Sequence, residues 1–212
     1  MQTIKLSEGT FTISRLLGKG KSGYSWLIEN SDVKYVLKRM HNEPCAYYKF
    51  GDKLESELEA HARLANLIAI PRLIEHNSVE KYLVKEYISG TPVSELAAQG
   101  RVPPEAFRQL FSWCGRLYDR GINIDYFPAN FIWTGEKLFY VDYELNPYSD
   151  EWNFENWGIF YWINSEGMNK FIKTGDHRAI NTDDNSGKPI TIPFTEKAAA
   201  LILEYKKATG AF

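Results

Sequence analysis

Residues 117–132 read LYDRGINIDYFPANFI, and the interpretation of the whole chain depends on this stretch. Asp125 and Asn130 stand five positions apart within it. The following residues, 131–142, predict a short hairpin that ends at Asp142. Each of these polar residues has an ordinary structural explanation, since an aspartate can form a turn and an asparagine can cap a helix. That Asp125, Asn130 and Asp142 occur together at these spacings favours a shared functional role instead.

The first part of the chain predicts an antiparallel meander with strands at 11–17, 24–29 and 33–40 and a glycine-rich turn at 18–23. Gly18, Gly20 and Gly23 satisfy G-x-G-x-x-G, which is a weak pattern by itself. A P-loop is excluded because Arg15 stands where its first glycine belongs, and a strand rather than a helix follows. The missing helix excludes a dinucleotide-binding loop too. A glycine-rich turn between antiparallel strands is typical of the loop that covers the nucleotide in protein kinases.

That interpretation requires a lysine on the third strand and a glutamate on the next helix. Lys38, in YVLK, occupies the strand position. The apolar period predicts a helix over 53–67, in which Glu59 fits best as the partner of Lys38 and Glu55, one turn earlier, is the alternative. A second hairpin over residues 71–88 follows this helix.

The strongest linker signal is Ser89-Gly90-Thr91-Pro92, so we place the boundary between two lobes after residue 89. Beyond it, the pattern predicts helices at 104–119, 152–165 and 195–208, with a polar loop at 176–193.

The stretch LYDRGINIDYFPANFI resembles the kinase catalytic segment L-H-x-x-G-I-x-H-x-D-L-x-P-x-N-I-L, and residues 85–90 resemble the M-E-Y-x-x-G hinge. The chain is therefore similar to the protein kinase-like superfamily over residues 18–142. The resemblance implies an α+β, two-lobed protein kinase-like fold with a reduced C-terminal lobe. Residues 1–89 would form the ATP-binding lobe, and residues 90–212 the mainly helical catalytic lobe.

The same resemblance implies ATP and Mg²⁺ as cofactors. The implied nucleotide-binding residues are Gly18, Gly20, Gly23, Lys38, Glu59, Glu86 and Ile88. Asp125 would accept or orient the proton of the acceptor hydroxyl, with Lys38 on the α- and β-phosphates. Asn130 and Asp142 would hold Mg²⁺, which prefers oxygen ligands.

Four departures from the kinase pattern concern the acceptor. Asn123, Ile124 and Phe127 replace the His, the Arg and the Lys found around the catalytic Asp in many protein kinases, and no A-P-E motif follows. Glu144 replaces the last residue of D-F-G, and Asp142-Tyr143-Glu144 resembles the I-D-[FWY]-E segment of choline and aminoglycoside kinases. We therefore expect a kinase that acts on a hydroxyl, with a small molecule favoured over a protein serine or threonine. The role of Glu144 stays open, and a non-catalytic nucleotide-binding protein is the further alternative.

Composition limits the other classes of function. The 212 residues carry 25 Lys+Arg against 27 Asp+Glu, so no basic excess indicates a nucleic-acid partner. No apolar stretch reaches the roughly 20 residues of a membrane span, and no signal peptide is visible. Cys45 and Cys114 form no CxxC pair, and His41, His61, His76 and His177 have no metal-ligand spacing. We expect a cytoplasmic protein.

Overall fold

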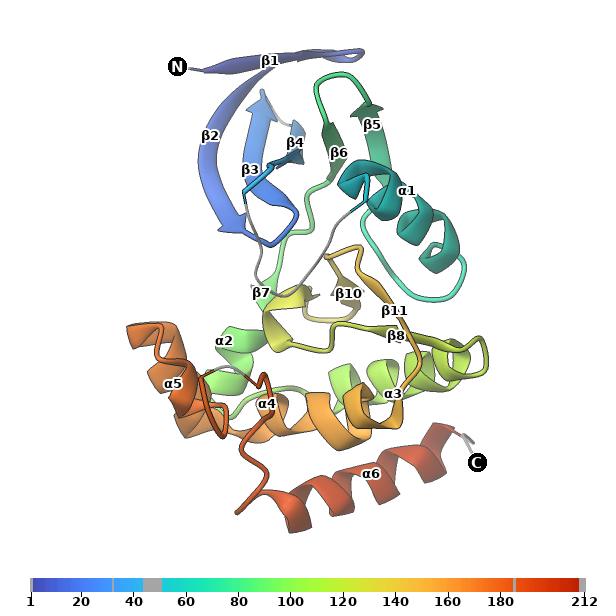
Figure 1. Cartoon of the computed structure of the whole chain (residues 1–212), viewed down its shortest axis with the longest axis vertical. Helices are drawn as coiled ribbons and strands as arrows, with labels where there is room; N and C mark the ends of the chain where they lie inside the picture. Colours follow the sequence, from blue (N-terminus) through green and yellow to red (C-terminus); the bar gives the residue numbers. More distant parts are fainter. Residues whose placement is uncertain (1, 32, 44–50, 185, 210–212) are drawn as a thin grey trace. The chain divides into compact units, whose positions relative to one another are not determined.

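The computed structural model describes residues 2–31, 33–43, 51–184 and 186–209, so Cys45 lies outside the described residues. The chain divides into two compact units (Figure 1). Unit 1 comprises residues 1–66 and 70–88, and unit 2 comprises residues 67–69 and 89–212. The units therefore part after Ile88, whereas the sequence placed the boundary after residue 89. Unit 1 is built mainly on an antiparallel sheet and unit 2 mainly on helices, which gives a mixed α+β architecture.

The sheet of unit 1 has six strands in the order β1-β2-β3-β4-β6-β5. They are β1 (Thr3–Leu6), β2 (Gly9–Lys19), β3 (Gly23–Asn30), β4 (Val33–Met40), β5 (Leu73–Asn77) and β6 (Tyr82–Glu86). All neighbouring pairs are antiparallel. The meander predicted the β2–β3 and β3–β4 pairs, and the second hairpin predicted the β5–β6 pair. The first strand was not predicted, and β2 continues through Gly18 to Lys19, so the glycine-rich turn is shorter than expected.

The two faces of this sheet differ in chemistry because side chains alternate along a strand. One face carries an apolar core of Ile4, Leu6, Phe11, Ile28, Tyr35, Leu37, Tyr82 and Val84. The side chain of Lys38 is buried on the other face. In the strand registers, Lys38 lies opposite Ser25 of β3 and Leu83 of β6. Helix α1 (Lys53–Leu64) contributes buried Leu54, Glu57, Ala60 and Leu64. The sheet therefore places a buried cation on the face that meets a helix with a buried carboxylate.

Unit 2 contains α2 (Val93–Ala98), α3 (Pro104–Tyr118), α4 (Ile159–Ile163), α5 (Ser165–Thr174) and α6 (Thr195–Thr209). The predicted helices at 104–119 and 195–208 match α3 and α6. The predicted helix at 152–165 is wrong as a single element, because Asn153 interrupts it in an extended conformation. The segment is instead a 3-10 turn (Asp150–Trp152), a π-helical stretch (Phe154–Gly158) and α4. Helices α2 and α5 were not predicted.

Aromatic side chains form the centre of unit 2. The buried Trp162 ring lies 5.1 Å from Phe131, 5.5 Å from Phe154 and 5.6 Å from Phe107, measured between ring centroids. Its Nε1 donates to the Tyr126 carbonyl at 2.9 Å. Helix α4 is thereby attached to the backbone next to Asp125, so the packing of these rings also positions a predicted site residue.

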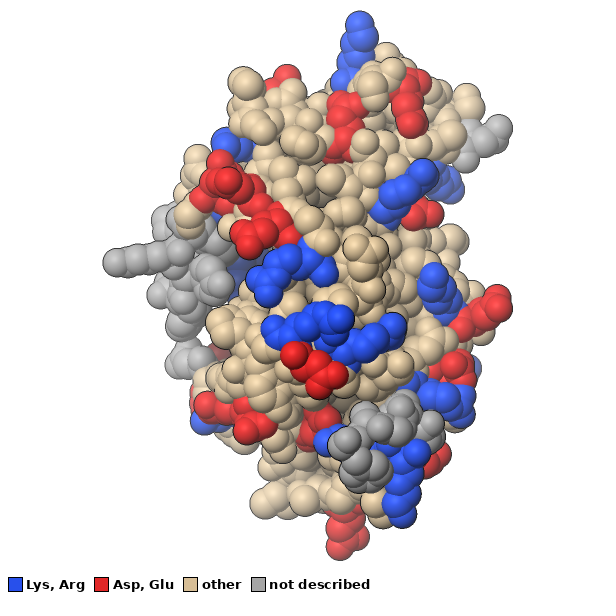
Figure 2. All heavy atoms as spheres, turned by 90° about the vertical axis from the view of Figure 1, so that its right-hand side faces the viewer, with Lys and Arg blue, Asp and Glu red and all other residues tan. Residues whose placement is uncertain are grey.

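Acidic and basic side chains are interspersed on the face shown in Figure 2. This agrees with the formal net charge of −2. Among the described residues, no helix combines the length and the apolar character needed to cross a membrane.

A pair of leucine truncations tests the assignment of the unit 2 core. Leu117 is completely buried on α3, whereas Leu203 on α6 is 55% exposed. We expect Leu117→Ala to lower the free energy of unfolding by about 3 kcal/mol through lost burial and the cavity left behind. Leu203→Ala should change it by less than about 0.5 kcal/mol. Denaturant titration followed by tryptophan fluorescence measures both values, and equal losses would contradict the described packing.

Candidate functional site

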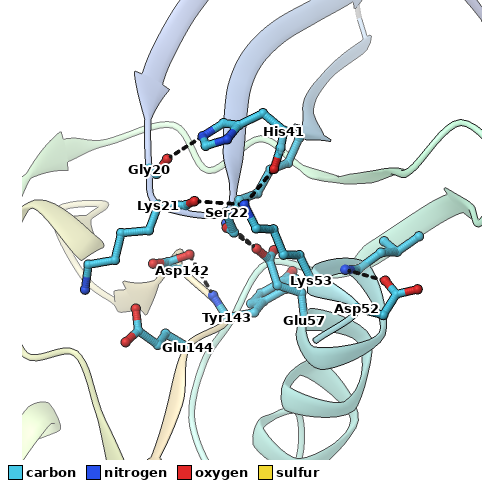
Figure 3. Close-up of polar contacts among 12 residues, drawn as sticks. Gly20, Lys21, Ser22, His41, Asp52, Lys53, Glu57, Asp142, Tyr143 and Glu144 are labelled. Atoms are coloured by element: carbon cyan, nitrogen blue, oxygen red, sulfur yellow. Dashed lines mark hydrogen bonds and ion pairs between the residues drawn. The ribbon is translucent and has the colours of Figure 1, made fainter. Parts of the chain in front are cut away.

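The glycine-rich turn between β2 and β3 is held in place through its carbonyl groups. The Nε2 atom of His41 lies 3.1 Å from the Gly20 carbonyl oxygen, and the His41 N–H donates to the Ser22 carbonyl at 3.1 Å. The Lys53 ammonium, at the start of α1, donates to the Lys21 carbonyl at 3.3 Å and to the His41 carbonyl at 2.6 Å (Figure 3). Three successive carbonyls of the turn are thus engaged by side-chain or backbone groups.

The N–H groups of the same turn are less engaged. The Gly20 N–H donates to the Gly23 carbonyl at 2.9 Å and closes the turn. The N–H groups of Lys21 and Ser22 have no hydrogen-bond acceptor among the described residues. Successive backbone N–H groups in a turn form a concave site for anions. The turn therefore offers two donors of the kind that a phosphate group accepts.

The three glycines of the pattern have different steric roles. A Cβ atom on Gly23 would lie 2.5 Å from the Arg39 carbonyl oxygen, a distance that real structures essentially never show. A Cβ on Gly18 would meet nothing within 4 Å, and on Gly20 the nearest atom is 3.8 Å away. Only Gly23 is thus required by the close approach of β4. The fold of the described residues gives no steric reason for glycine at positions 18 and 20.

The buried partner of Lys38 is Glu57, and the predicted pairing with Glu59, or alternatively with Glu55, is wrong. The Lys38 Nζ atom lies 2.5 Å from Glu57 Oε1, and both side chains are less than a tenth exposed. Glu55 and Glu59 are exposed. The reason is the helical period, because Glu57 lies on the buried stripe of α1 and the other two glutamates lie off it. The spacing of Glu57 from Leu54 and Leu64 was a signal in the sequence that the prediction overlooked.

Glu57 also binds the glycine-rich turn. The Ser22 hydroxyl donates to Glu57 Oε1 at 2.7 Å, so Ser22 and Lys38 share one carboxylate oxygen. The other oxygen, Oε2, is buried and has no hydrogen-bond partner among the described residues. Neither Ser22 nor Lys53 was identified from the sequence. No motif marks them, since their roles depend on contacts between the turn and a helix that begins 31 residues after Ser22.

In unit 2, two strand pairs position the predicted catalytic and metal residues. Strand β9 (Phe131–Trp133) pairs with β10 (Leu138–Tyr140), and β8 (Ile122–Ile124) pairs with β11 (Leu145–Pro147). Asp125 follows β8 directly, and Glu144 immediately precedes β11. Because Ile124 is paired with Leu145, Asp125 and Glu144 lie at the same end of that ladder.

Hydrogen bonds shape the two polar loops between these strands. Asp125 Oδ1 accepts the Phe127 N–H at 3.0 Å, and the Asn130 amide donates to the Asp125 carbonyl at 3.3 Å. The Val141 N–H donates to the Asn130 carbonyl at 2.8 Å. Asp142 Oδ1 accepts the N–H of Tyr143 at 3.1 Å. Asp125, Asn130 and Asp142 therefore lie in two loops that the Val141–Asn130 hydrogen bond joins into one network.

Tyr140 is a buried member of this network that sequence analysis did not single out. Its hydroxyl donates to the Glu144 carbonyl at 3.2 Å, and its ring packs 5.2 Å from Phe131. Burial raises the pKa of the Tyr140 hydroxyl well above its ordinary value, and nearby carboxylates raise it further, namely Asp142, Asp125 and Glu144. The negative charges of these carboxylates therefore act on the same buried hydroxyl.

The residue types fit Mg²⁺ in part. Among the described residues, no group of three or more His, Cys, Asp or Glu side chains is arranged to hold a metal ion. Mg²⁺ is usually held by one or two carboxylates together with water and substrate phosphates, so it needs no complete protein cage. The Asn130 amide oxygen has no donor among the described residues, and Asp142 supplies a carboxylate. These two side chains suit an ion delivered with a phosphate.

The positions that depart from the kinase pattern have structural explanations. Ile124 is buried, which suits an apolar residue better than an arginine. Asn123 is buried as well, and its amide donates to the Ser149 carbonyl at 3.0 Å, while its Oδ1 has no partner among the described residues. The Phe127 ring packs 5.2 Å from Tyr161 and 5.9 Å from Phe171. Phe127 is therefore a packing residue of unit 2.

The predicted hinge residues lie at the end of unit 1. Glu86 is the last residue of β6, its N–H donates to the Arg72 carbonyl at 2.9 Å, and its carboxylate accepts the Arg72 N–H at 3.3 Å. These bonds give Glu86 a structural role at the start of β5. Ile88 is the half-buried last residue of unit 1.

Comparison with known proteins adds no family assignment. No protein-family model matches the chain, and no curated protein matches it significantly.

Two glycine substitutions separate the steric role from any role toward a ligand. We expect Gly23→Ala to lower the free energy of unfolding by about 1–3 kcal/mol, because its Cβ would overlap the backbone of β4. Gly18→Ala should change it by less than about 0.5 kcal/mol. Thermal and chemical denaturation check both, and a destabilised Gly18→Ala protein would contradict the described turn.

A pair of charge-neutralising substitutions tests the corrected ion pair. Glu57→Gln leaves the buried Lys38 ammonium without its anionic partner, and we expect a loss of about 3 kcal/mol in the free energy of unfolding. Glu59→Gln, on the exposed side of the same helix, should change it by less than about 0.5 kcal/mol. The reverse order in a denaturant titration would restore the prediction made from sequence.

Proposed function

We propose that the chain is an ATP- and Mg²⁺-dependent phosphotransferase with a protein kinase-like fold, and that it transfers the γ-phosphate to a hydroxyl acceptor. One observation in particular supports the proposal. The buried Lys38–Glu57 pair and the glycine-rich turn with its two N–H donors belong to one hydrogen-bonded cluster. A buried lysine held by a glutamate is costly to desolvate, so a role toward an anion explains its presence better than stability does.

The residues of unit 1 would bind the phosphates. The Lys21 and Ser22 N–H groups would donate to phosphate oxygens, and Lys38 would add a positive charge whose direction Glu57 fixes. Positioning and charge neutralisation are what phosphoryl transfer requires most from a protein.

The residues of unit 2 would act at the acceptor. The acceptor oxygen forms a bond to the γ-phosphorus, the bond from that phosphorus to the β–γ bridging oxygen breaks, and ADP leaves. Asp125 would take or orient the proton that the acceptor hydroxyl loses. Mg²⁺, when bound by Asp142 and Asn130, would neutralise charge on the phosphates.

The short segment after Asp142 favours a small-molecule acceptor. Residues 145–147 are taken up by β11, and the 3-10 turn Asp150–Trp152 follows. Between Asp142 and Trp152 the chain therefore has no long loop that could present a surface for a peptide. The buried Ile124 also leaves no arginine there to receive a phosphate from such a loop.

ATP consumption with and without Mg²⁺ tests the proposal, together with a screen of acceptors that covers amino alcohols, sugars, aminoglycosides, a generic protein and the chain itself. Mg²⁺-dependent phosphorylation of one small-molecule class is the expected result. Phosphorylation of protein alone would overturn the acceptor class. Protein that binds no nucleotide and consumes no ATP would overturn the phosphotransferase.

A substitution at the proposed metal ligand gives a sharper test. We expect Asp142→Asn to lower Mg²⁺-dependent turnover at least a hundredfold while the melting temperature stays within a few degrees. Asp119→Asn is the matched control, because Asp119 is an exposed residue at the end of α3 in the same unit. Near-normal turnover by a folded Asp142→Asn protein would contradict the assignment of the metal ligand.

A further inference from the structure

The cluster around Glu57 connects two parts of the candidate site that are distant in sequence. Glu57 Oε1 accepts from Ser22 in the glycine-rich turn and pairs with Lys38 on β4 (Figure 3 shows the Ser22 contact). Lys53, one helical turn before Glu57, donates to the Lys21 carbonyl. We propose that Ser22 and Lys53 are positioning residues that couple the conformation of the turn to the orientation of Lys38. The part of this inference that concerns phosphate rests on the proposed function.

The shared carboxylate oxygen is the physical basis of the coupling. Two donors on one oxygen compete for its electron density, so the strength of the Lys38 contact depends on the Ser22 contact, and hydrogen bonds to a charged group are strong. The second Glu57 oxygen is buried with no hydrogen-bond partner among the described residues, so the described contacts of this carboxylate are concentrated on Oε1. A movement of the turn that withdraws the Ser22 hydroxyl would therefore change how Glu57 Oε1 holds Lys38.

Ser22 takes part in the coupling through both its side chain and its backbone. Its hydroxyl binds Glu57, and its own N–H is one of the two turn donors without a described acceptor. An anion bound at that N–H would fix the same residue whose side chain orients Glu57. Phosphate in the turn and the geometry of the ion pair would then favour each other, which is the reciprocity expected of coupled sites.

Lys53 holds the turn from the helix side. A positive charge in the first turn of a helix opposes the helix dipole, so the location of Lys53 needs an explanation beyond helix stability. Its contacts with the Lys21 and His41 carbonyls supply one. The preceding residue, Asp52, caps α1 and pairs with Lys81 at 2.5 Å, which anchors this helix end on the turn between β5 and β6. Lys53 therefore holds the glycine-rich turn to the N-terminal end of α1, which the Asp52–Lys81 pair keeps in place.

Steady-state kinetics with ATP tests the role of Ser22. We expect Ser22→Ala to lower kcat about tenfold with the KM for ATP within threefold, since the backbone donors remain. Ser22→Thr keeps the hydroxyl and should restore kcat to within twofold of the unsubstituted protein. Ser14→Ala is the control, because it removes a hydroxyl on β2 that donates to the Leu27 carbonyl. In a Glu57→Gln background, Ser22→Ala should add less than a twofold loss. A further tenfold loss there would show that Ser22 acts without Glu57 and would overturn the coupling.

Binding of the fluorescent nucleotide mant-ATP tests the role of Lys53. Lys53→Met should raise the Kd for mant-ATP about tenfold, because the turn loses its attachment to α1. Lys34→Met, at an exposed position on β4, should change the Kd by less than twofold. Equal Kd values for the two variants would overturn the role assigned to Lys53.

A measurement on the nucleotide-free protein separates this inference from the proposed function. Lysines are acylated with an N-hydroxysuccinimide ester, and the rate at Lys38 is measured by mass spectrometry relative to the exposed Lys5. Ser22→Ala and Lys53→Met should each raise the relative rate at Lys38 at least threefold, and Ser14→Ala should leave it unchanged. Unchanged rates in the first two variants would overturn the coupling even if the protein turns over ATP. Raised rates in a protein that binds no nucleotide would uphold the coupling and reject the proposed function.

Discussion

The Glu57 carboxylate is the constraint on which the candidate site of unit 1 depends. A charged carboxylate is expensive to bury, and it is stable here because Lys38 and Ser22 both direct hydrogens at its Oε1 atom. The requirement works in both directions, since the buried Lys38 on β4 equally needs an anion. Helix α1 must therefore present its buried stripe to one face of the sheet, and the glycine-rich turn must stay close to that helix. The Glu57 carboxylate thus links the sheet, the turn and the helix through Lys38 and Ser22.

Unit 2 relies on backbone pairing where unit 1 relies on charge. The β8–β11 and β9–β10 ladders bracket two polar loops, and the Val141 N–H joins them at the Asn130 carbonyl. Tyr140 adds a hydroxyl contact to the carbonyl of Glu144 from within the core. The acidic side chains of these loops repel one another, so their proximity requires a rigid scaffold. The aromatic packing around Trp162 supplies that rigidity and attaches to the backbone at Tyr126.

The proposed phosphotransferase would be a simple one. Residues that many protein kinases use for regulation are replaced by groups that serve packing, as Ile124 and Phe127 do. Groups suited to phosphate, to an oxygen-bound cation and to a hydroxyl proton are retained. Such a chain would depend on its substrates for activity, and the coupling between Ser22 and Lys38 would make phosphate binding itself the event that orders the site.

Local patterns in the sequence predicted the strand order of the meander, the helices α3 and α6, and the short hairpin before Asp142. These features follow from local periodicity and from short hairpins, which act over a few residues. Contacts in the folded protein were needed to establish that Ser22 and Lys53 hold the turn, and that Asn153 divides a predicted helix. Each of these depends on which side chain faces a distant element. Glu57 is an intermediate case: a step of two residues along α1 turns a side chain by more than half a turn, and the spacing from Leu54 and Leu64 is what distinguishes Glu57 from Glu59.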